Sequence, residues 1–69
     1  MPLSMMEVGS KHRICAISGN DSVRKHLGDL GFTEGAEVTI IAAVDGNLVL
    51  GIHQSRVAIN RDLAMRILV

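Results

Sequence analysis

Aromatic side chains are nearly absent from this 69-residue chain, which has one phenylalanine and neither tryptophan nor tyrosine. A barrel that binds nucleic acid normally offers aromatic rings for base stacking and an excess of positive charge. Here seven basic residues balance seven acidic ones, so the formal net charge is zero. The composition therefore argues against a nucleic-acid partner.

Cysteine is scarce as well, and long apolar runs are missing. A single cysteine, Cys15, cannot form an internal disulfide, and without a secretory signal the default prediction is a reducing, cytoplasmic environment. We expect its thiol to be a small buried side chain within a strand. No apolar run approaches the ~18 residues that a membrane-spanning helix needs, so no direct membrane insertion is expected. The length predicts one domain, residues 1–69.

The apolar residues that are present form short segments of strand type. Alternation in residues 35–44 predicts a strand with Val38, Ile40, Ala42 and Val44 on one face. Further short strands are expected in residues 11–19, 48–53, 56–59 and 66–69. "DGN" is a hairpin turn signal. Five short strands in so small a chain favour a mainly β fold that closes as a small barrel and so hides its sheet edges.

One segment changes to a helical period, directly after the first strand. Val23, Leu27 and Leu30 lie four and three residues apart, which predicts a single short helix with one apolar stripe. Asn20 or Asp21 can accept hydrogen bonds from the free backbone N–H groups at its start.

Three glycines surround the end of this helix. A left-handed Gly31 would close it and bring Phe32 onto Leu27. "TEGA" predicts a type II turn with Gly35 at the position of positive φ. For Gly28, inside the helix, we expect a close approach to a neighbouring strand. No lysine and serine or threonine follow the last glycine, so these glycines are interpreted as structural rather than as a phosphate loop.

The chain resembles the FeoA family in three segments, "LGDLGFTEGAEVTII", "LVLGIHQSRVAI" and "NRDLAMRILV". The positions that match the family pattern, in order, are Leu27, Leu30, Gly31, Phe32, Gly35, Ala64, Ile67 and Val69. The resemblance covers nearly the whole chain and implies an SH3-like β-barrel, in agreement with the strand count. It departs from the pattern at the second hairpin turn, where many members have glycine and this chain has Gln54-Ser55, and at Asn60, where many have a basic residue.

The resemblance also implies a partner, the FeoB ferrous-iron transporter with its cytosolic GTP-hydrolysing domain. FeoA would be its small cytosolic accessory protein, recruited to the inner face of the membrane. The candidate contact residues are Arg24, Lys25, His26 and Asp29 on the helix, together with Arg56. Either Arg24 or Arg56 could stabilise transferred phosphoryl charge in trans. Recognition of proline-rich peptides, the usual SH3 role, needs an aromatic-lined groove that this composition does not provide.

Metal binding is the competing interpretation. His26 and Asp29 are spaced to share one helix face, and His12 or His53 would have to supply a second imidazole for a ferrous site. A solvated helix face explains the same residues, so weak iron binding stays a hypothesis and no cofactor is required. No nucleophile motif is present, and an enzyme is not expected. The alternative function is a stand-alone metal-responsive domain related to those of iron-dependent repressors. Whether the chain is a monomer or a dimer is left open.

Overall fold

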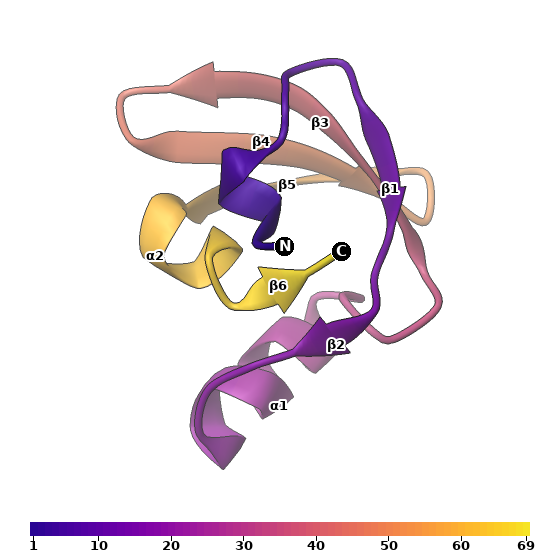
Figure 1. Cartoon of the computed structure of the whole chain (residues 1–69), viewed down its shortest axis with the longest axis vertical. Coiled ribbons are helices and arrows are strands. Elements are labelled where there is room, and N and C mark those ends of the chain that lie inside the picture. Colours follow the sequence, from indigo (N-terminus) through magenta and orange to yellow (C-terminus); the bar gives the residue numbers. More distant parts are fainter.

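A four-stranded antiparallel sheet forms one side of the molecule. A two-stranded sheet, two short helical segments and the chain ends lie against its inner face, and the longest helix extends below the sheet (Figure 1). The computed structural model describes all residues, Met1–Val69. The elements in chain order are η1 (Leu3–Met5), β1 (Lys11–Arg13), β2 (Ala16–Ile17), α1 (Asp21–Asp29), β3 (Glu37–Val44), β4 (Asn47–Ile52), β5 (Ser55–Asn60), α2 (Arg61–Ala64) and β6 (Ile67–Leu68). The large sheet has the order β1-β3-β4-β5, and β2 pairs with β6. Neither α1 nor α2 is long or apolar enough to cross a membrane.

The first expected strand is divided between the two sheets. β1 pairs with β3, whereas β2 pairs with β6. Ile14 lies at the junction and is 2% exposed, so the chain turns there and Cys15 faces outward. The prediction of a buried thiol was therefore wrong. The division gives six strands where five were expected, because one strand leaves the first sheet and enters the second.

A bulge interrupts the expected alternation in β3. The register with β4 shifts between Ile40 and Ala42, so two residues of β3 stand where one was expected. Val38 and Ile40 are fully buried, but beyond the bulge Val44 is 54% exposed. The predicted single face of β3 holds only as far as Ile40, since one extra residue reverses the side on which later side chains lie.

The helix α1 begins and ends as its sequence predicts. Asn20 Oδ1 accepts a hydrogen bond from the N–H of Val23 at 2.9 Å. At the other end, Gly31 has φ +103°, its N–H donates to the carbonyl of Gly28 at 3.0 Å, and the N–H of Phe32 donates to that of Leu27 at 3.0 Å. These are the two bonds of a Schellman motif. Phe32 and Leu27 are both fully buried and belong to the core.

The turn after this motif also follows the prediction. Gly35 has φ +85°, and the N–H of Ala36 donates to the carbonyl of Thr33 at 3.1 Å. The side chain of Arg13 donates to the Gly35 carbonyl at 2.8 Å and so links the turn to β1.

The end of the chain closes the structure against its beginning. Asn60 accepts a hydrogen bond from the N–H of Leu63 at 2.8 Å and starts α2. The N–H of Val69 donates to the carbonyl of Met1 at 2.7 Å, so the two ends lie side by side (Figure 1). Twelve apolar residues form one core between the sheets, and no polar side chain is buried in it.

Gly28 differs from its expected role. A Cβ placed on it would meet no atom within 4 Å, so the predicted close approach to a strand was wrong. In contrast, a Cβ on Gly31 would lie 3.1 Å from Cδ2 of His53. Gly28 therefore destabilises the helix, because glycine loses more conformational entropy on folding than alanine and no close packing requires it here.

We predict that Gly28→Ala raises the free energy of unfolding by about 0.5–1 kcal/mol, the difference between glycine and alanine inside a helix. The matched variant Gly31→Ala should lower it by about 1 kcal/mol or more, because alanine is strained at positive φ. Urea unfolding followed by circular dichroism measures both. A destabilised Gly28→Ala variant would mean that this position is packed after all.

Candidate functional site

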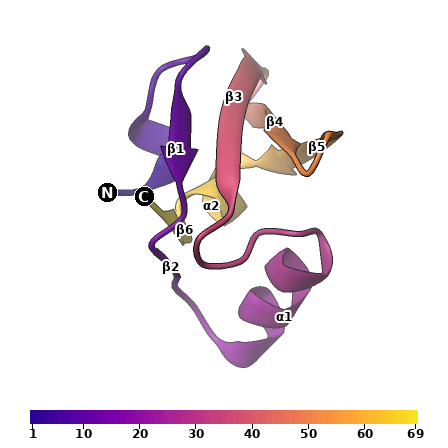
Figure 2. The ribbon, with the colours of Figure 1, turned by 90° about the vertical axis from the view of Figure 1, so that its right-hand side faces the viewer.

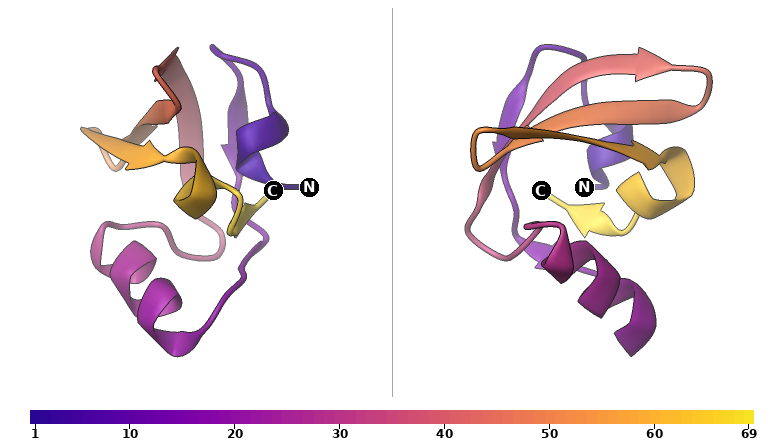
Figure 3. Two further views of the ribbon diagram at one scale, coloured as in Figure 1. Left: turned by 90° about the vertical axis from the view of Figure 1, so that its left-hand side faces the viewer. Right: turned by 180° about the vertical axis from the view of Figure 1, so that it is seen from behind.

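The exposed face of α1 carries most of the residues predicted to contact a partner. Arg24, Lys25, His26 and Asp29 are all exposed, and Leu27 on the opposite face holds the helix to the core. The helix stands below the sheet in two perpendicular views (Figures 2 and 3), away from β3 and β4. It presents a mixed-charge ridge with positive charge near its middle and a carboxylate at its end.

The histidines are held at separate places rather than gathered around a metal. Nε2 of His12 is 2.8 Å from Oγ of Ser10, and the ring of His53 lies against Gly31. His26 is exposed on α1. No three histidine, cysteine or carboxylate side chains are grouped so that they could hold a metal ion. His26 and Asp29 thus offer at most two ligands on an open helix face.

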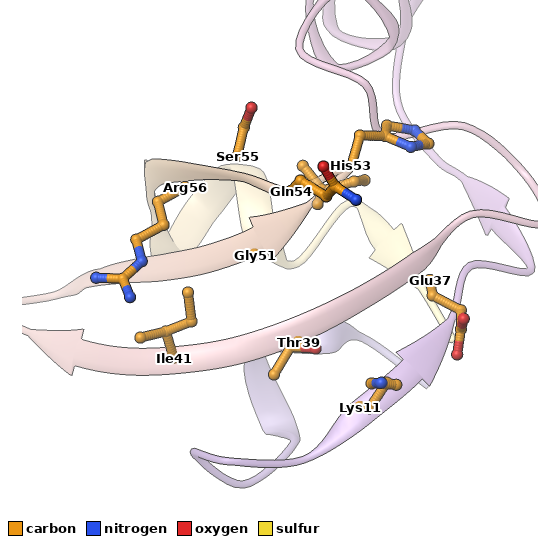
Figure 4. Close-up of a pocket in the computed structure, with 10 residues that line it drawn as sticks. Lys11, Glu37, Thr39, Ile41, Gly51, His53, Gln54, Ser55 and Arg56 are labelled. Carbon is orange, nitrogen blue, oxygen red and sulfur yellow. The ribbon is translucent and has the colours of Figure 1, made fainter.

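Arg56 lies on a different surface, the outer face of the four-stranded sheet. It borders a shallow hollow whose lining includes Lys11, Thr39, Gly51 and His53 (Figure 4). Arg56 was predicted from the sequence as a contact residue, whereas the other residues of the hollow were not predicted to form a site with it. Their common signal is cross-strand register, since Lys11 pairs with Thr39, Thr39 with Gly51, and Gly51 with Arg56.

The hairpin turn beside the hollow lies one residue earlier than expected. Its two central residues are His53, with φ +48°, and Gln54, with φ +65°, and Ser55 already belongs to β5. The first hairpin turn, by comparison, has Asp45 and Gly46 at positive φ, as "DGN" predicts. The left-handed conformation costs a residue with a side chain about 1 kcal/mol or more. The His53-Gln54 turn is therefore strained.

The α1 face and the hollow are connected at the turn. Because His53 lies against Gly31, the rim of the hollow meets the C-terminal end of α1.

This arrangement, with a curved four-stranded sheet packed over a second short sheet, is an SH3-like fold. It matches the crystal structure of an iron uptake regulatory protein, FeoA, with a TM-score of 0.90 and 29% identity over 97% of this chain and 91% of that one. FeoA of Stenotrophomonas maltophilia, solved with zinc and described as an SH3 domain protein, matches with a TM-score of 0.85 and 24% identity over 99% and 87% of the two chains.

The model of the FeoA domain matches residues 1–69. The chain therefore belongs to the FeoA family, which confirms the resemblance found in its sequence. A manganese-dependent transcriptional repressor shares the fold, with a TM-score of 0.88 and 16% identity over 97% of this chain and 39% of that chain. The comparison with curated proteins found no match.

The strained turn gives a second prediction. Gln54→Gly should raise the free energy of unfolding by about 0.5–1 kcal/mol, because glycine adopts positive φ without strain. Ser55→Gly, one residue later and inside a strand, should lower it by about 0.5–1 kcal/mol. Thermal or urea unfolding of the two variants checks this. If Ser55→Gly were the stabilised variant, the turn would lie where the sequence alone suggested.

Proposed function

We propose that this chain is a non-enzymatic accessory protein of ferrous-iron uptake that docks on the cytosolic side of a FeoB-type transporter. Membership of the FeoA family, a family connected with ferrous iron transport, carries this proposal. The relative from Stenotrophomonas maltophilia is described as a possible activating factor for that transport. The protein would then act in the cytoplasm and reach the membrane through its partner.

The exposed face of α1 is the proposed contact surface. Its four polar residues extend into solvent from a helix that the core holds by its opposite face. None of the four side chains takes part in the hydrogen bonds that start or end the helix. These side chains can therefore bind groups of a partner in place of water, with little effect on the stability of the fold. Opposite charges on the partner would speed the encounter and fix its orientation.

A titration of isotope-labelled protein with the isolated G domain of its transporter tests the proposal. Backbone amide shifts should concentrate in residues 22–31. In the double variant Arg24→Glu, Lys25→Glu, the affinity for the G domain should fall at least tenfold, because the two introduced carboxylates would be repelled by the acidic groups that the wild-type cations attract. Arg66→Glu, an exposed charge reversal outside α1, is the matched control and should bind as the wild type does. A spectrum that does not respond at high G-domain concentration contradicts the proposal.

A metal-responsive role is the second candidate, because the same fold occurs in a manganese-dependent repressor and one relative was solved with zinc. In this chain the ligands would be His26 and Asp29, which are exposed and lack a third neighbour. We predict that an anaerobic titration with ferrous ion gives only weak, fast-exchanging changes at these two residues, since two ligands form a poor site. Saturation at micromolar ion that is lost in His26→Ala would instead favour the metal-responsive role.

A further inference from the structure

The hollow on the outer face of the sheet is bordered by two cations with a glycine between them, an arrangement that the α1 face lacks. Four residues from four strands lie in line across it, Lys11 of β1, Thr39 of β3, Gly51 of β4 and Arg56 of β5. Their neighbours along β3 and β4, Ile40 and Leu50, are fully buried on the other face of the sheet. The row therefore faces solvent, with a cation at each end and the smallest residue between them.

The missing side chain of Gly51 forms the floor of the hollow. A Cβ placed on it would lie 3.2 Å from Cδ1 of Ile41, which the bulge in β3 turns toward this face. Ile41 is half-buried and forms an apolar wall beside Arg56 (Figure 4). The bulge and the glycine together thus leave a depression of about 670 Å³ in a sheet face that is otherwise covered by side chains.

Two cations and one carboxylate line the hollow, Lys11, Arg56 and Glu37. Glu37 is opposite Arg13 in register and lies diagonally from Lys11 on the same face, so it offsets only part of the positive charge at that end of the row. The guanidinium of Arg13 also donates to the Gly35 carbonyl. Lys11 and Arg56 form no hydrogen bond of this kind and extend on opposite sides of Gly51 (Figure 4). The hollow therefore keeps a net positive charge in a protein whose formal net charge is zero.

We propose that this hollow binds an extended acidic segment of a partner protein, with carboxylates at Lys11 and Arg56 and the backbone of the segment over Gly51. Neighbouring strands are about 4.8 Å apart, so the two cations start about 14 Å from each other. In an extended chain, side chains on one face four residues apart are separated by a similar distance, about 14 Å. Glutamate or aspartate at such a spacing would meet both cations at once.

The position of the hollow suits a partner that also contacts α1. His53 lines the hollow and its ring lies beside Gly31, so the hollow borders the C-terminal end of α1. The identity of the partner rests on the proposed function, but the chemistry of the hollow does not. The test therefore uses a probe that is independent of the transporter.

The probe is a capped ten-residue peptide of alternating glutamate and threonine, titrated into the isotope-labelled full chain. Amide shifts should concentrate at Lys11, Thr39, Gly51 and Arg56. They should vanish in about 1 M salt, where the Debye length falls to about 3 Å. The same peptide with glutamine in place of glutamate should cause no shifts, because it has the shape of the probe without the charge.

Charge-reversal variants make the test specific to the hollow. The double variant Lys11→Glu, Arg56→Glu should lose at least tenfold in affinity for the peptide, and Arg66→Glu should bind it as the wild type does. Unchanged binding by the double variant, or shifts spread evenly over the surface, would overturn the proposal. A response of the same amides to inorganic phosphate but not to the peptide would also overturn it, since the hollow would then be a small-anion site.

The G domain separates this proposal from the function proposed above. If the double variant and the wild type bind the G domain equally, the hollow is not part of the docking surface although docking itself holds. If the G domain does not bind the wild type while the peptide occupies the hollow, the docking proposal fails and the acidic-segment site stands.

Discussion

The burial of Phe32 directly after a left-handed glycine is the constraint on which the rest of the structure depends. Gly31 turns the chain at the end of α1, and the only aromatic side chain of the protein then enters the core beside Leu27. A fully buried phenylalanine contributes about 1.5–3 kcal/mol from its apolar area, a large share of the stability of so small a domain. The same turn directs the chain into the type II turn and β3, so it links the end of the helix to the start of the sheet.

That closure also defines where a partner can bind. The core takes the apolar stripe of α1 and leaves its charged side in solvent. His53, held in a strained turn at φ +48°, packs on Gly31 and so connects this side to the outer face of the sheet. The buried side of α1 thus stabilises the fold, and its exposed side is the proposed contact surface. Strain at a non-glycine turn residue is tolerated in proteins where the surrounding structure fixes it, often beside a functional surface.

Local signals in the sequence were reliable wherever a short-range hydrogen bond decides the conformation. The cap by Asn20, the Schellman closure and the turn at Gly35 were all correctly predicted, because each needs only residues within one turn of chain. The prediction from alternation was wrong beyond the bulge in β3, where one extra residue leaves Val44 exposed. Cys15 became exposed because its strand changes sheets, which no local pattern indicates. Of the candidate site, the α1 residues could be found from helical spacing, whereas the row of residues from Lys11 to Arg56 depends on register between four strands.

The sequence by itself determined the class of the fold, the position of the helix, the buried role of Phe32 and, through its resemblance, the FeoA family. Only the tertiary structure decided which strands are neighbours, where the second hairpin turns and which charges face each other across the sheet. The physical reason is the range of the interactions. Caps and glycine turns are satisfied within a few residues, but register and strand exchange are set by packing the whole core at once, and a shift of one residue moves every following side chain to the other face.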